Sequence, residues 1–143
     1  MAIRVIISDD HAIFRRILRG FLDLETDIAV IAEAGDGQQL LELARSVVPD
    51  VICMDIRMPG MDGIEATQRL LADQPGARVI GLSSYNDPHY IDAMLRAGAC
   101  GYLSKMDAAD RLPDAIRAVA GGARFVLGPG IVSAAEPGAP GGV

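Results

Sequence analysis

The stretch "ICMDIRMPGMDG", residues 52–63, carries one carboxylate between an apolar run and a turn. Asp55 ends the apolar run, and Pro59 and Gly60 follow within five residues. Proline lacks an amide hydrogen and glycine adopts φ angles that other residues avoid, so the chain leaves a strand here and turns into a helix capped near Asp62. The pattern predicts a buried strand whose last residue, Asp55, is accessible at the rim of a sheet.

Strand and helix patterns alternate on both sides of this stretch. Short β-branched runs typical of strands covered on both faces lie at 4–8, 28–34, 50–54, 77–83 and 100–104. Apolar residues at helical spacing follow each run, within 13–22, 40–47, 64–71, 91–95 and 112–119. Repeats of this length favour right-handed crossovers, so the sequence predicts an α/β fold, a doubly wound parallel sheet of five strands with helices on both faces.

Length and composition narrow the classes of protein. The 143 residues suit one domain, which would bury roughly two thirds of the surface of its unfolded chain. A formal net charge of −6 argues against nonspecific binding to nucleic acid. No apolar stretch is long enough for a bilayer and no signal peptide is visible, which predicts a cytoplasmic protein with no membrane partner. Cys53 and Cys100 lack the spacing of a zinc site and are predicted to be reduced core residues.

Polar side chains gather where the predicted strands end. They are Asp9 and Asp10 after the first strand, Asp55 after the third, Ser83 after the fourth and Lys105 after the fifth. In open α/β sheets, ligands bind beyond these carboxyl ends. Two carboxylates about 4 Å apart repel by on the order of 4 kcal/mol at an effective dielectric near 20, which one lysine offsets only in part. An all-oxygen cluster suits Mg²⁺, which prefers a phosphate oxygen as a further ligand, so the implied substrate is a phosphoryl group.

These residue types also suggest the chemistry. With the metal bound, the Asp55 carboxylate can act as a nucleophile and form an acyl phosphate. The Lys105 ammonium would pair with a phosphoryl oxygen during transfer, and the Ser83 hydroxyl would hydrogen-bond another oxygen after it. His11 is expected to start a helix rather than to bind metal, because the other ligands are all oxygens.

Four motifs together resemble the receiver domains of bacterial response regulators. They are "SDD" at 8–10, "MDIRMPGMDG" at 54–63, "LSS" at 82–84 and "GYLSK" at 101–105. The likeness covers residues 3–121 and is similar in particular to the LuxR/NarL-type subfamily, although Met106 stands where many receivers have a proline. It implies a flavodoxin-like fold with strand order 2-1-3-4-5.

The resemblance also implies roles in phosphoryl transfer from a sensor histidine kinase. Asp55 would be the phosphoacceptor and Lys105 the residue that binds the phosphoryl group. The Mg²⁺ ligands would be Asp10, Asp55 and the backbone carbonyl of Arg57, with Asp9 acting through water. Such a protein catalyses its own phosphorylation and dephosphorylation but is primarily a signalling switch.

Switching would involve two further residues. By the resemblance, Ser83 is the switch hydroxyl and Tyr102 the aromatic that swings inward when Ser83 is drawn to the phosphate. A phosphorylation-dependent homodimer is expected, through the first and fifth helices or through the fourth helix and the fifth strand.

The predicted domain organisation is a receiver at 1–121 and a Gly/Pro/Ala-rich linker or tail at 122–143. Members of the subfamily continue into a helix-turn-helix domain, for which this tail has too little amphipathic sequence. It carries no Lys or Arg after Arg124, so we expect DNA binding and transcriptional control only through a C-terminal domain missing here. The chain would be either a truncated regulator or a stand-alone receiver.

Two other function classes remain open. Haloacid-dehalogenase-like phosphatases also form an aspartyl-phosphate, but they carry a second Asp two residues after the nucleophile, and position 57 is Arg. A pseudo-receiver would keep the fold as a protein-interaction module without the chemistry. The combination of Asp9, Asp10, Asp55, Ser83 and Lys105 argues against the pseudo-receiver.

Overall fold

Seven strands form one sheet in the computed structural model, which describes residues 1–84, 88–128 and 131–135. They are β1 (Ile3–Ser8), β2 (Ile28–Ala34), β3 (Val51–Asp55), β4 (Arg78–Ser83), β5 (Gly101–Ser104), β6 (Arg124–Gly128) and β7 (Ile131–Ala135). The spatial order is β2-β1-β3-β4-β5-β6-β7, parallel from β2 to β6, with β7 antiparallel to β6. The first five strands confirm the predicted α/β fold and its order.

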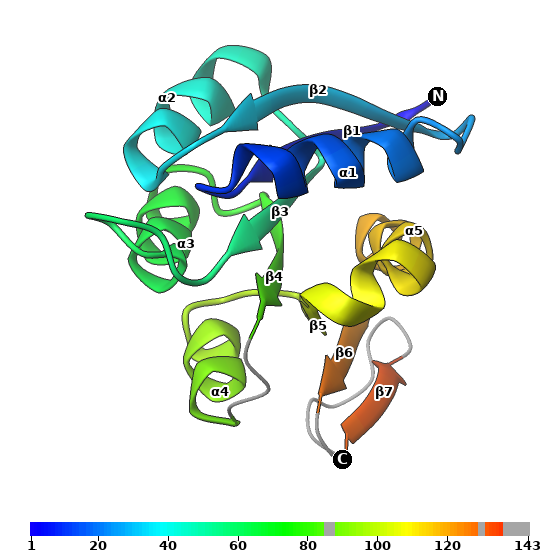
Figure 1. Ribbon diagram of the computed structural model, residues 1–143. Helices are drawn as coiled ribbons and strands as arrows, with labels where there is room; N and C mark the ends of the chain where they lie inside the picture. The colour runs from blue at the N-terminus through cyan, green and yellow to red at the C-terminus, as the bar shows by residue number, and fades with distance from the viewer. Residues whose placement is uncertain (85–87, 129–130, 136–143) are drawn as a thin grey trace.

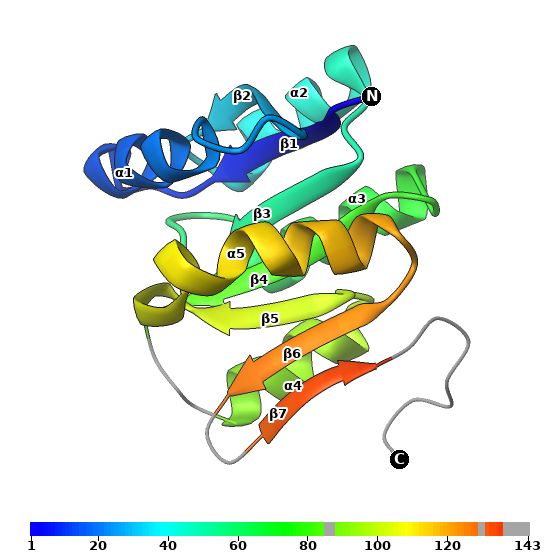
Figure 2. The same cartoon turned by 90° about the vertical axis from the view of Figure 1, so that its right-hand side faces the viewer.

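Five helices cover the two faces of the sheet (Figures 1 and 2). They are α1 (Ala12–Leu22), α2 (Gly37–Val47), α3 (Gly63–Asp73), α4 (Pro88–Arg96) and α5 (Lys105–Ala120). Helices α1 and α5 pack on one face and α2, α3 and α4 on the other, as Figure 2 shows. None of the described helices is long and apolar enough to cross a membrane.

Alternating strand residues supply two separate apolar cores. Val5 and Ile7 of β1 pack with α1 and α5, whereas Ile6 between them packs with the helices of the other face. Every residue of β3 is buried, including Asp55 at its end. Because both faces of a central parallel strand are covered, ligands reach such a sheet at the ends of its strands rather than on its faces.

The sheet has two strands more than the sequence predicts. Strand β6 pairs with the edge of β5, with Gly101 opposite Phe125 and Tyr102 opposite Val126. Phe125 and Val126 are buried, one in each core, and the Arg111 guanidinium lies 5.3 Å from the centroid of the Phe125 ring. The apolar run of β6 is therefore long enough to extend the sheet, although Gly and Pro dominate the residues after it. That 122–143 serve as a linker stays a prediction.

Candidate functional site

The turn after β3 holds Asp55 at the rim of the sheet. A Cβ at Gly63 would lie 2.2 Å from the Asp55 carbonyl oxygen, so only glycine allows α3 to begin this close to the strand. Gly60 adopts a φ of 76°, which is also a glycine conformation. Asp62 caps α3 by accepting a hydrogen bond from the Glu65 amide at 2.9 Å, which confirms the predicted cap.

A hollow of about 300 Å³ opens above Asp55. Its lining residues are His11, Asp55, Arg57, Ser83, Ser84 and Lys105. Ser83 is the last residue of β4 and is buried, while Lys105 is the first residue of α5 rather than part of a strand. The structure thus brings Asp55, Ser83 and Lys105 together from three segments of the chain.

Four side chains form an acidic cluster at this hollow. One ligand atom from each of Asp9, Asp10, His11 and Asp55 lies within 4.8 Å of the others. Lys105 Nζ lies 2.6 Å from Asp9 Oδ2 and 3.5 Å from Asp55 Oδ2, so one cation pairs with two of the three carboxylates of the cluster. The cluster keeps a net negative charge even with Lys105 in place.

Two carboxylate oxygens of the cluster lack a hydrogen bond. Within the described residues, Asp9 Oδ2 and Asp10 Oδ1 are buried and have no hydrogen-bond partner. The contact of Lys105 with Asp9 supplies charge without hydrogen-bond geometry. An unsatisfied buried oxygen is costly, and a hard divalent cation satisfies carboxylate oxygens of this kind. The donor set therefore fits such a cation.

His11 belongs to this cluster, which the sequence analysis did not foresee. It is the residue before α1, as expected, but its Nδ1 lies 3.1 Å from Asp9 Oδ1 and 3.2 Å from Asp10 Oδ1. Its amide also donates to Asp9 Oδ1 at 2.8 Å. The imidazole is 66% exposed and lies beside the two acids at the mouth of the hollow. Direct adjacency to the acid pair was the signal that could have found it.

Electrostatics set the protonation of Asp55. Burial, followed by the charge of Asp9, raises the pKa of Asp55 from 3.8 to about 6, against the opposing charge of Lys105. Bringing an additional cation to the site would lower this pKa and favour the ionised carboxylate. The ionised form is the one that can act as a nucleophile.

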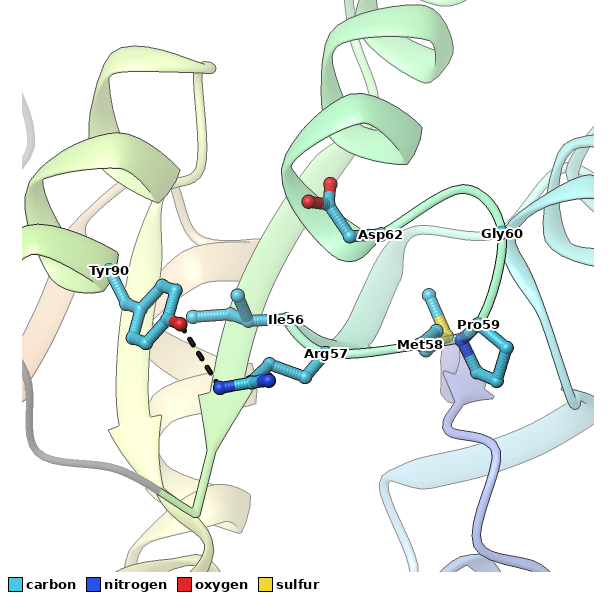
Figure 3. Close-up of a pocket in the computed structure, with 7 residues that line it drawn as sticks. All are labelled: Ile56, Arg57, Met58, Pro59, Gly60, Asp62 and Tyr90. Atoms are coloured by element: carbon cyan, nitrogen blue, oxygen red, sulfur yellow. Dashed lines mark hydrogen bonds between the residues drawn. The ribbon is translucent and has the colours of Figure 1, made fainter.

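Arg57 lies between this hollow and a second one. Figure 3 shows its side chain pointing toward Tyr90 of α4, and Nη1 donates a hydrogen bond to the Tyr90 hydroxyl at 3.1 Å. The second hollow, of about 510 Å³, is lined by Ile56, Arg57, Met58, Pro59, Gly60, Asp62 and Tyr90. The side chain of Arg57 thus connects the β3–α3 turn to α4, whereas the role of its backbone carbonyl as a metal ligand stays a prediction.

Tyr102 is fully buried in the structure. It lies on β5 between Gly81 of β4 and Val126 of β6 in the strand register, and it packs in the core formed with α2, α3 and α4. Its ring therefore already occupies an inward position. That Tyr102 and Ser83 move together on phosphorylation stays a prediction.

Residues 5–117 match the family model of the response regulator receiver domain. The chain belongs to this family. It is 40% identical over 124 residues to the transcriptional regulatory protein DegU of Brevibacillus brevis, covering 87% of this chain and 52% of that protein. It is 43% identical over 120 residues to the transcriptional regulatory protein LiaR of Bacillus subtilis (strain 168), covering 84% and 57%. The receiver chain spans about half the length of these curated relatives.

Solved structures of response regulators have the same fold. A two-component response regulator of the LuxR family from Aurantimonas sp. SI85-9A1 superposes with a TM-score of 0.85 at 32% identity, covering 92% of this receiver and 93% of that chain. The isolated receiver domain of RcsB from Salmonella enterica serovar Typhimurium, with the phosphomimetic BeF₃⁻, gives a TM-score of 0.81 at 28% identity, covering 89% and 94%. The predicted LuxR/NarL-type relationship is confirmed.

Proposed function

We propose that this receiver is a phosphorelay switch in which Asp55 accepts a phosphoryl group from a sensor histidine kinase. One observation carries the proposal: the buried Asp55 carboxylate at a strand end lines a hollow with Lys105, and within the described residues its neighbours Asp9 and Asp10 each have a carboxylate oxygen without a hydrogen bond. Lys105 Nζ lies 2.6 Å from Asp9 Oδ2, but one lysine offsets the charge of only one of the three acids, so a divalent cation and a phosphoryl group would complete the site.

The proposed metal is Mg²⁺. Its ligands would be carboxylate oxygens of Asp10 and Asp55 and the backbone carbonyl of Arg57, with Asp9 acting through water. Supporting this set, the ligand atoms of the three acids lie within 4.8 Å of one another and Asp10 Oδ1 has no hydrogen-bond partner among the described residues. When bound, Mg²⁺ would neutralise negative charge on the acids and on the incoming phosphoryl group.

Asp55, Lys105 and Ser83 then have separate roles in phosphoryl transfer. An oxygen of the Asp55 carboxylate attacks phosphorus, the bond from phosphorus to the donor nitrogen of the kinase histidine breaks, and the electron pair leaves with the imidazole. Lys105, 3.5 Å from Asp55 Oδ2, turns its ammonium to a phosphoryl oxygen. Ser83 donates to another oxygen, and a shift of Ser83 near the already buried Tyr102 would link phosphorylation to the shape of the β4–α4–β5 surface.

Helix α1 offers a surface for the kinase. Ile13, Ile17 and Phe21 are exposed at a spacing of four residues and form one apolar stripe along the helix. The stripe begins next to His11, which lines the hollow. An exposed apolar stripe beside a reactive site is suited to a partner that must bring its own reactive group there. We assign the kinase to this stripe, and a phosphorylation-dependent second copy of the chain is the competing occupant.

The proposed output is transcriptional. The relatives DegU and LiaR are named transcriptional regulatory proteins, and the receiver spans about half of each. With a net charge of −6, the receiver itself is a poor match for DNA, so contact with DNA would belong to a helix-turn-helix domain joined to it. A cytoplasmic location fits this role and is part of the proposal.

Labelling with a small phosphodonor tests the central claim. Asp55→Asn is expected to abolish the single phosphoryl group that acetyl phosphate and Mg²⁺ add to the wild type, because the amide is a poor nucleophile and a poor metal ligand. Intact-protein mass spectrometry measures the label. Asp73→Asn, which changes an exposed acid paired with Arg45 at the end of α3, is the matched control and should label normally. Equal labelling of the Asp55 variant would refute the assignment.

A further inference from the structure

Two arginines of α1 share one acid of the neighbouring strand. Arg15 Nε lies 3.1 Å from Glu33 Oε1, and Arg19 Nη1 lies 2.7 Å from Glu33 Oε2. Glu33 belongs to β2, which runs beside α1 in Figure 1. The hydrogen bond from Arg19, and less strongly that from Arg15, holds the pKa of Glu33 below its usual value, so the acid stays ionised. Both arginines thus pair with Glu33, Arg19 more strongly than Arg15.

Arg15 and Arg19 differ in the second contact that each side chain makes. Arg15 Nη1 donates to the backbone carbonyl of Asp9, whereas Arg19 Nη2 donates to the carbonyl of Val30, in the middle of β2, at 3.2 Å. Only Arg15 reaches the acidic cluster. The Asp9 amide also donates to the Ala34 carbonyl at 3.0 Å, so the backbone of Asp9 is held on both sides.

The carbonyl of Asp9 and the amide of Asp10 belong to one rigid peptide plane. Fixing that carbonyl therefore restricts the directions of both acids that flank the plane. The Arg15 side chain donates to the backbone carbonyl of Asp9 and not to its carboxylate, so it does not occupy a metal-binding oxygen. Glu33 carries one negative charge for both Arg15 and Arg19, so it offsets the charge of Arg15 only in part.

We propose that Arg15 is a positioning residue, which orients Asp9 and Asp10 toward a bound cation by holding the peptide between them. The inference rests on the proposed metal site and gives a role to a residue outside the proposed set of ligands. Outer partners that orient metal ligands change metal affinity about 10-fold to 100-fold when they are removed. Because Arg15 touches neither the phosphoacceptor nor the hollow, its loss should change cation affinity rather than the chemical step.

The test is a titration of metal-free protein with Mg²⁺ alone. Calorimetry and the amide NMR shifts of residues 9 and 10 measure the binding. Arg15→Met keeps the length of the side chain and removes its donors, and we expect Mg²⁺ to bind about 10-fold more weakly. Arg19→Met is the matched control, since it also breaks a contact with Glu33, and should bind within about twofold of wild type. Arg15→Lys can replace one of the two hydrogen bonds and should fall between them.

A second measurement separates positioning from chemistry. With acetyl phosphate, Arg15→Met should need more Mg²⁺ for half-maximal labelling but reach the wild-type rate at saturating Mg²⁺. Wild-type Mg²⁺ affinity in folded Arg15→Met, or an equal loss in Arg19→Met, would overturn the proposal. If Arg15→Met fails to fold, Glu33→Gln should still weaken Mg²⁺ binding, and unchanged binding would count against it. A wild type that binds no Mg²⁺ would refute the proposed metal site, and this inference with it.

Discussion

Acidic residues at the amino ends of the strands differ in their hydrogen bonding from those at the carboxyl ends. At the amino ends of the strands, Arg117 donates to both oxygens of Asp27, at 2.8 and 3.0 Å, and Asp50 accepts the Arg4 amide at 2.8 Å. At the carboxyl ends, Asp9 and Asp10 each keep a buried oxygen without a hydrogen bond within the described residues. Asp27 and Asp50 are hydrogen-bonded within the fold, whereas Asp9 and Asp10 have oxygens that the proposed cation would satisfy.

The pKa directions follow this difference. The hydrogen bond from Arg117 lowers the pKa of Asp27, whereas burial raises that of Asp55 to about 6. Ionisation of Asp27 therefore stabilises the folded protein, whereas ionisation of Asp55 destabilises it. The stability of the protein should respond to pH in opposite directions when the two edges are changed separately.

The largest expected effect is a gain in stability from Asp55→Asn without divalent cations. Since the folded-state pKa of Asp55, about 6, lies above 3.8, the free energy of unfolding falls as the pH rises through this range. Roughly two pKa units correspond to about 3 kcal/mol as an upper bound. The variant lacks this loss, so it should exceed wild type at pH 8 and converge with it near pH 4 in urea denaturation. A variant that is less stable than wild type at pH 8 would contradict this comparison.

Adding Mg²⁺ should have an effect of similar size on the wild type. A cation that binds only the folded state at 100 times its Kd raises the free energy of unfolding by about 2.7 kcal/mol. The rise should be much smaller in Asp55→Asn, which loses a proposed ligand, and unchanged in Asp73→Asn. Thermal unfolding with and without Mg²⁺ measures both, and an equal rise in all three proteins would place the cation elsewhere.

A smaller change in stability, of the opposite sign, is expected for a substitution at the amino ends of the strands. Arg117→Met removes the exposed ion pairs with Asp27 and Glu25 and should lower the melting temperature slightly at neutral pH. The pKa of Asp27 is lowered in the folded state, so its contribution is present above the usual pKa and is lost as the pH falls through the lowered one. The difference from wild type should therefore shrink in acid, as for Asp55→Asn, but here it is a loss of stability at neutral pH rather than a gain. A difference that grows in acid would show that these pairs do not act as described.

The parts of the fold that the sequence predicted are those with strong local signals. The β-branched run before Asp55 and the turn through Pro59 and Gly60 need no distant partner to be recognised. Strand β6 was missed because its run is short and next to Gly and Pro, and it becomes a strand only by pairing with β5. His11 and Arg15 were missed as parts of the site because each acts through a contact with Asp9 that no spacing rule describes.

The sequence by itself determined the alternation of strands and helices and the presence of acids, a serine and a lysine at the strand ends, because periodicity and residue type are local properties. Only the tertiary structure decided how these groups share charge: Lys105 lies nearer to Asp9 than to Asp55, and Arg15 holds the Asp9 backbone. Distances of a few ångströms between segments far apart in the chain set the interaction energies of these charged groups. They depend on how α1 and α5 pack against the sheet, which no single segment specifies.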